Sequence, residues 1–328
     1  MKRILCTGDS HTWGQGVTHL MEEFDPPTVA GDLRLASFRS GGYVNRLRRF
    51  VEQTTGSRSF EWSARELAQL ANVPYVAPCA QLSGAPLTLS FTGSLLRVEY
   101  ARAATPCVWE LMVDGAHRDG GELPAATGEN QLCLSHIHLD EGTHTLTLRA
   151  VEGTLPLFRI ESYAGDFAVI NSGIGSCPTF RFQEEYFLDH AKAVKPAIVL
   201  AEAHTINDWI AGAPPAVYAD RLEALLRAFQ ELGATVILMT VAPISGCQRW
   251  QEGPLYDAYN EAARQAAARL GVPVCDANRL MNLCIEGMTE EEKHTFLLDD
   301  PWHPNDRGHA LYAEMLAQTL CQQGLLTV

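Results

Sequence analysis

The chain has 328 residues, of which 46% are hydrophobic and 20% are charged, so it can bury a full core in more than one folding unit and is neither disordered nor fibrous. The formal net charge of −14 disfavours nucleic acid as a main ligand and an anionic membrane surface, because both bind through cationic contacts. No apolar run approaches the roughly 20 residues of a membrane-spanning helix.

The N-terminus and the cysteines favour a cytoplasmic protein. Only three apolar residues follow Lys2 and Arg3, which is too few for a signal peptide. The nine cysteines are an odd number without C-x-x-C spacing, and most stand in apolar stretches, as reduced thiols do. A secreted chain without its leader would begin in the same way, but it would more often pair its cysteines evenly.

Five short apolar runs predict the buried strands of a parallel sheet. They are residues 3–7, 167–171, 197–203, 234–241 and 272–276. Helical patterns separate most of these runs, at residues 43–72, 217–232 and 255–270, and a last helix is predicted at 307–321. Glycines at 233 and 271 fit the ends of two of these helices. The alternation of strands and helices predicts a doubly wound α/β fold.

The segment 78–165 shows a different pattern. Its runs L-T-L-S-F, L-R-V-E-Y and H-T-L-T-L-R-A alternate apolar and polar positions, which is typical of antiparallel strands. Asp114-Gly115 and Glu141-Gly142 stand between such runs and predict hairpin turns. We therefore expect a β-sandwich domain at residues 78–165, inserted into an α/β domain made of residues 1–77 and 166–328.

Ser10 follows the first predicted strand, in the sequence Gly8-Asp9-Ser10-His11. Open α/β sheets bind ligands at the carboxyl ends of their strands, where loops and helix N-termini present backbone N–H groups. Ser10 is thus placed for chemistry. From this motif alone, a helix N-cap explains Ser10 equally well.

Asp300 and His303 lie three residues apart just before the last predicted helix, in the run D-D-P-W-H-P-N-D-R-G-H. A serine hydroxyl is a weak nucleophile at neutral pH and needs an imidazole to take its proton, as His303 can. A nearby carboxylate such as Asp300 can accept the other ring N–H and stabilise the imidazolium. The alternative is that this spacing arose by chance and that Asn305 or Asp306 merely caps the helix.

Together, these N-terminal and C-terminal motifs resemble those of the SGNH or GDSL hydrolases. The resemblance implies a flavodoxin-like three-layer αβα fold around a five-stranded parallel sheet. It also implies a serine esterase with Ser10 as nucleophile, His303 as general base and Asp300 as the partner of that base. Neither a cofactor nor a metal is implied.

The same family supplies an oxyanion donor from an Asn after the third strand, usually within G-x-N-D. Here the third strand ends in A-E-A-H-T-I-N-D-W, so Asn207 and Asp208 match, although Thr205 replaces the usual Gly. The resemblance implies that the Asn207 side chain and the Ser10 N–H bind the oxyanion.

A third donor is expected from a Gly-containing turn after the second strand, which ends here in V-I-N-S-G-I-G-S. Alignment on Asn171 puts Ser176 at the donor position, with Gly175 one residue earlier. Because the donor is a backbone N–H, either residue can serve. We expect Gly175, with Ser176 as the alternative.

The resemblance covers about the first 75 and the last 160 residues. The segment between them resembles the accessory β-sandwich, jelly-roll-like in form, of some carbohydrate esterases, although that module precedes the catalytic domain there. We therefore expect hydrolysis of an oxygen ester through an acyl-enzyme, with deacetylation of a carbohydrate as the leading candidate and a small-molecule or glycan ester as the partner.

Several alternatives to this function remain. They are an acyl-thioesterase or lysophospholipase of the same fold and a non-catalytic glycan-binding protein. A two-metal phosphoesterase is disfavoured because the motifs G-N-H-D and G-H-x-H are absent. The sequence does not determine the oligomeric state.

Overall fold

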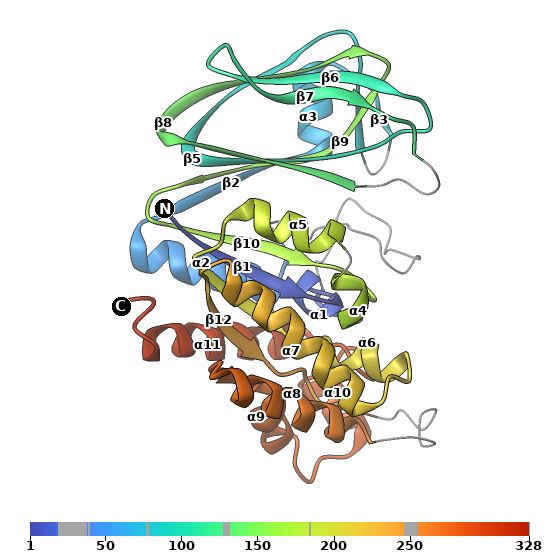
Figure 1. Cartoon of the computed structure of the whole chain (residues 1–328), viewed down its shortest axis with the longest axis vertical. Coiled ribbons are helices and arrows are strands. Elements are labelled where there is room, and N and C mark those ends of the chain that lie inside the picture. Colours follow the sequence, from blue (N-terminus) through green and yellow to red (C-terminus); the bar gives the residue numbers. More distant parts are fainter. Residues whose placement is uncertain are drawn as a thin grey trace. The chain divides into compact units, whose positions relative to one another are not determined.

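The computed structural model describes residues 1–18, 38, 40–76, 79–126, 132–183, 185–245 and 255–327. Within these ranges the chain forms two compact units: Met1 with residues 56–168, and residues 2–18, 38, 40–55 and 169–327 (Figure 1). No helix in the described part is both long and apolar enough to cross a membrane. All eight cysteines in these ranges are free thiols.

The larger unit is built around a five-stranded sheet in the order β10-β1-β11-β12-β13. Its strands are β1 (Lys2–Gly8), β10 (Phe167–Gly173), β11 (Ile198–Glu202), β12 (Thr235–Met239) and β13 (Val274–Cys275). The pairs β1 with β11, β11 with β12 and β12 with β13 are parallel. All five strands predicted from apolar runs are confirmed, because a strand covered by helices on both faces must be apolar throughout.

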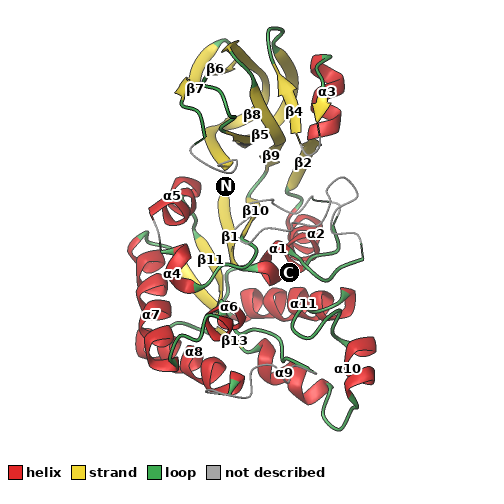
Figure 2. Ribbon diagram, turned by 90° about the vertical axis from the view of Figure 1, so that its right-hand side faces the viewer, coloured by secondary structure: helices red, strands yellow, loops and turns green. Residues whose placement is uncertain are grey.

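Helices cover both faces of this sheet (Figure 2). On one side lie α5 (Glu185–Val194), α7 (Pro215–Glu231) and α8 (Tyr256–Leu270), and on the other lie α2 (Tyr43–Thr55), α9 (Ala277–Cys284) and α11 (Asp306–Gln322). Four shorter helices stand in the connections: α1 (Ser10–Trp13), α4 (Thr179–Phe182), α6 (Thr205–Ile210) and α10 (Glu290–Phe296). The expected α/β fold with three layers is confirmed.

The continuous helical stretch expected at residues 43–72 is wrong. Helix α2 stops at Thr55, and Gly56 then adopts a φ of 74°, which ends the helix because this left-handed conformation suits glycine. A strand follows, β2 (Arg58–Ser63), and then the helix α3 (Ala64–Ala71), whose N-cap Ser63 forms a capping box with Glu66. The smaller unit therefore begins at residue 56 rather than at the expected 78.

The smaller unit is an antiparallel sheet in the order β3-β4-β9-β5-β8-β6-β7, with β2 paired to β9. The remaining strands are β3 (Tyr75–Val76), β4 (Cys79–Leu82), β5 (Leu87–Ala101), β6 (Cys107–Val113), β7 (Ala116–Leu123), β8 (Leu132–Glu152) and β9 (Leu155–Ala164). The long strand β5 has a register shift between Gly93 and Leu95. Residues before and after that shift, such as Leu89 and Val98, belong to one hydrophobic core. The antiparallel strands expected in this segment are thus present.

The two predicted hairpin turns had different outcomes. Asp114 and Gly115 join β6 to β7, and both have a positive φ, 53° and 75°, as a type I′ turn requires. Glu141 and Gly142 instead lie within β8, where Gly142 is paired with Gly93 of β5. The expected turn there is wrong, because the residues on both sides of it pair with the same neighbouring strand.

Candidate active site

Ser10 begins the helix α1 directly after the end of β1. Asp9 caps this helix by accepting the His11 N–H, so Ser10 is not the cap. Gly14 ends the helix in the left-handed region. Ser10 itself is 5% exposed. Its hydroxyl is therefore held in a fixed, nearly buried position at the carboxyl edge of the sheet.

His303 and Asp300 lie beside Ser10 although 293 residues separate His303 from it. The His303 Nε2 is 2.9 Å from the Ser10 Oγ, and the His303 Nδ1 is 2.6 Å from the Asp300 Oδ2. An ionised carboxylate can only accept, so Nδ1 carries the ring proton. Nε2 then presents its lone pair to the Ser10 O–H, which is the arrangement in which an imidazole can take the proton of a serine.

Asp300 is held in its ionised form. Partial burial by itself would raise the pKa of Asp300, but the hydrogen bond and charge of His303 lower it. The backbone N–H groups of Trp302 and His303 act in the same direction by donating to the Asp300 Oδ1, at 3.0 and 2.8 Å. The helix α11 is capped separately by Asn305, so capping leaves Asp300 and His303 available to Ser10.

Asn207 lies inside α6, and its side chain points to Asp9. The Asn207 Nδ2 donates to the Asp9 Oδ2 over 2.6 Å. Because a carboxylate only accepts, this contact orients the amide with its nitrogen toward Asp9, and one N–H remains for another acceptor. The N-cap position of α6 belongs to His204, which has a φ of 54°.

Gly175 and Ser176 form the turn after β10. The N–H of Ile174 donates to the Gly8 carbonyl over 3.0 Å, so the turn begins beside the residues that precede Ser10. Gly175 is half-buried, whereas Ser176 is exposed and has a φ of 54°. Either backbone N–H stays a candidate donor.

The far side of this turn is tied to the segment that carries Asn207. Asp208 is fully buried and accepts from the Thr179 N–H at 2.7 Å and from the Thr179 hydroxyl at 2.8 Å. The His204 Nδ1 is 2.7 Å from the Cys177 carbonyl oxygen. The turn after β10 and the loop after β11 are thereby held together.

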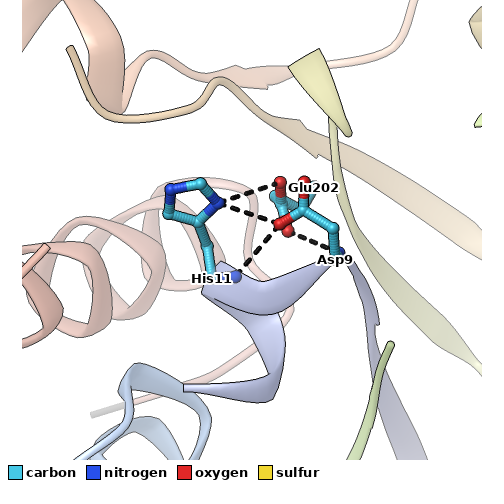
Figure 3. Close-up of side chains that lie close together, drawn as sticks. All are labelled: Asp9, His11 and Glu202. Atoms are coloured by element: carbon cyan, nitrogen blue, oxygen red, sulfur yellow. Dashed lines mark hydrogen bonds and ion pairs between the residues drawn. The ribbon is translucent and has the colours of Figure 1, made fainter. Parts of the chain in front are cut away.

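A buried cluster of Asp9, His11 and Glu202 was missed by the sequence analysis (Figure 3). The His11 Nδ1 is 2.8 Å from the Asp9 Oδ1 and 3.8 Å from the Glu202 Oε1. Glu202 also accepts from the Asp9 N–H and from the Thr12 hydroxyl, at 2.8 and 2.9 Å. A glutamate at the end of an apolar strand was a visible signal, because buried carboxylates require partners.

The three ionisable groups of the cluster perturb one another. Burial alone would lower the pKa of His11, but Asp9 and Glu202 raise it to about 9. Burial and the charge of Asp9 raise the pKa of Glu202 to about 8. Burial works against ionisation of Asp9, yet the charge and hydrogen bonds of His11 hold the pKa of Asp9 far below its usual value. At neutral pH the cluster thus contains an ionised Asp9, a cationic His11 and a neutral Glu202.

The same three residues have the composition of a metal site. In the described part of the chain, each of these three residues offers one possible ligand atom, and the three atoms lie within 4.8 Å of one another. In this arrangement both His11 nitrogens face acceptors, because Nε2 is 2.7 Å from the Trp302 carbonyl oxygen. A ring that donates from both nitrogens has no lone pair to offer a metal.

We expect Glu202→Gln to change the pH dependence of stability more than stability at neutral pH. The folded state keeps the Glu202 proton up to a pH of about 8, while the unfolded chain loses it near 4.5, so the wild type loses stability as pH rises between these values. Glutamine has no proton to lose and should flatten this part of the profile. Thermal unfolding of both proteins from pH 5 to 9 measures the effect, and parallel profiles would contradict it.

We expect Gly8→Ala to destabilise the protein by about 1–3 kcal/mol through overpacking. A Cβ on Gly8 would lie 2.2 Å from the Glu202 Oε2 and 2.5 Å from the Glu202 Cβ, so the β11 backbone would have to move. Urea unfolding measures the loss. Gly142→Ala is the matched control, because its Cβ would meet only the His144 ring at 3.6 Å or more. Equal effects of the two substitutions would contradict the prediction.

In a comparison with protein families, residues 157–311 match the GDSL-like lipase/acylhydrolase family. The matched region contains Asn207, Asp300 and His303, whereas Ser10 lies outside it. No curated protein matches the chain.

Among solved structures, the fold is similar to that of a peptidoglycan O-acetylesterase, with 17% sequence identity and a TM-score of 0.54 over 98% of this chain and 91% of that one. Protein YXIM from Bacillus subtilis is 14% identical, with a TM-score of 0.45 over 81% of this chain and 88% of that one. An acetylxylan esterase from Geobacillus stearothermophilus is 21% identical, with a TM-score of 0.40 over 46% of this chain and 71% of that one.

Proposed function

We propose that the chain is a serine esterase that acts through an acyl-enzyme, and the match of residues 157–311 to the GDSL-like lipase/acylhydrolase family supports this proposal. The observation that carries this proposal is the continuous hydrogen-bonded series from Asp300 through His303 to Ser10. These contacts have the geometry that activates a serine hydroxyl.

In the proposed mechanism the Ser10 Oγ attacks the ester carbonyl while the His303 Nε2 takes its proton. Asp300 holds the Nδ1 proton and stabilises the imidazolium that forms. His303 then gives its proton to the leaving alcohol, and the acyl group stays on Ser10. Water, deprotonated by His303, attacks this acyl-enzyme and releases the acid.

The proposed oxyanion hole consists of the Asn207 side chain, the Ser10 N–H and the Gly175 N–H, with Ser176 as the alternative third donor. The contact between Asn207 and Asp9 supports the assignment of Asn207, because it orients the amide nitrogen toward Asp9, the residue before Ser10. A donor that is already oriented needs no reorganisation when charge develops on the carbonyl oxygen.

We propose acetyl groups on a carbohydrate as the substrate class. The support is the similarity in fold, over nearly the whole chain, to a peptidoglycan O-acetylesterase. The chain also has a second compact unit of antiparallel strands, residues 56–168, and we assign this unit to an accessory, sandwich-type role in a glycan-directed esterase.

A panel of esters tests the proposal: acetylated oligosaccharides, short nitrophenyl esters, acyl-thioesters and lysolipids. Turnover of the acetylated sugars above the other substrates is expected, whereas preference for thioesters or lysolipids would replace the substrate class but keep the mechanism. Labelling by a fluorophosphonate separates an esterase from a glycan-binding protein, because only an activated serine reacts. Absence of both labelling and turnover would overturn the proposed function.

A further inference from the structure

His11 is fully buried, and its two ring nitrogens face atoms that can only accept hydrogen bonds. Nδ1 lies 2.8 Å from a carboxylate oxygen of Asp9, and Nε2 lies 2.7 Å from the carbonyl oxygen of Trp302. A carbonyl oxygen has no proton to give, and the ionised Asp9 has none either. Both ring nitrogens must therefore carry protons, which makes His11 a buried cation.

The two bonds of His11 reach the two halves of the site. Through Nε2 it holds the peptide that joins Trp302 to His303, and His303 bonds Ser10. Through Nδ1 it holds Asp9, which in turn accepts from the Asn207 amide. One side chain thus connects the loop of the proposed general base with the segment of the proposed oxyanion donor.

We propose that His11 is a positioning residue for ester hydrolysis: a buried imidazolium that aligns His303 with Ser10 through the Trp302 carbonyl and keeps Asn207 oriented through Asp9. This role rests on the proposed function, since His11 contacts no reacting atom itself. Small displacements of catalytic groups cost large factors in rate, so the loss of either bond should lower kcat.

His11 also lies close to His303, and the centroids of the two rings are 5.4 Å apart. The other groups around His11 are Asp9, Glu202 and His309. Burial lowers the pKa of His309 to about 3, so His309 is neutral, and Glu202 is neutral until the pH nears 8.

Two substitutions separate the bonds of His11. His11→Asn places an amide nitrogen near the position of Nδ1 and retains a donor to Asp9, whereas His11→Gln places one near Nε2 and retains a donor to Trp302. Both remove the charge. We expect each to lower kcat on a small ester by on the order of ten- to hundredfold with a much smaller change in KM. His294→Asn, on α10, is the control.

Two further measurements complete the test. Nitrogen-15 NMR of the folded wild type should show His11 doubly protonated at pH 7.5. Treatment with a chelator should leave the activity unchanged. A singly protonated His11, or activity that a chelator removes and zinc restores, would overturn the proposal. So would variants that melt earlier but keep the wild-type kcat. A wild type that neither hydrolyses esters nor reacts with a fluorophosphonate would instead overturn the proposed function, and the role of His11 with it.

Discussion

Ser10→Ala is expected to lower esterase turnover by on the order of a thousandfold or more while leaving the fold intact. In the proposed mechanism this substitution removes the oxygen that forms the acyl-enzyme, so the remaining rate would come only from substrate binding and the oxyanion donors. The hydroxyl's known partner is the His303 ring, and its loss removes a single hydrogen bond. Stability should therefore change by about 1 kcal/mol or less.

The kinetics should be measured with a short nitrophenyl ester and the stability by thermal unfolding. Ser90→Ala is a suitable control, because Ser90 lies on β5 in the smaller unit and its hydroxyl donates to the His144 carbonyl oxygen. The alanine variant at position 10 should also lose fluorophosphonate labelling. Unchanged turnover would show that another group is the nucleophile.

The sequence was sufficient to predict the parallel sheet, because its strands are buried on both faces and each gives a short apolar run. The sequence also predicted that Ser10, Asn207 and His303 lie at the same edge of the sheet. Ser10 and Asn207 follow strands that end there, and His303 stands just before the last helix. The structure places His303 at 2.9 Å from Ser10 and Asn207 at 2.6 Å from Asp9.

Other features depend on contacts between distant residues, which periodicity does not report. The local pattern does not reveal the strand β2, because its antiparallel partner β9 begins about 100 residues later and local patterns carry no information on that pairing. The turn expected at Glu141-Gly142 failed for a similar reason, since its flanking residues share the neighbour β5.

The buried cluster was missed because its members lie at the ends of two strands that are 193 residues apart in sequence. Asp9 and His11 could be read only as parts of the serine motif, and Glu202 only as a polar residue in an apolar strand. Their ionisation states follow from burial and mutual contact, so they became visible only in three dimensions.

Asn207→Ala is expected to lower kcat by roughly 10² to 10³ while changing KM for a small ester much less. Negative charge develops on the carbonyl oxygen only as the tetrahedral state forms, so a donor aimed at it stabilises the transition state more than the bound ester. Asn207 suits this role because its amide donates without titrating and is already oriented by Asp9.

A cap role for Asn207 would predict a different result, namely a loss of about 1 kcal/mol in stability with an unchanged kcat. The structure argues against a cap role for Asn207, because α6 begins at Thr205 and its N-cap is His204. Alanine at 207 also leaves Asp9 with one hydrogen bond fewer, so some loss of stability is expected beside the kinetic effect. Asn282→Ala is the matched control, since that amide donates to Asn278 within α9. A variant at 207 that melts early but keeps its kcat when folded would remove Asn207 from the proposed oxyanion hole.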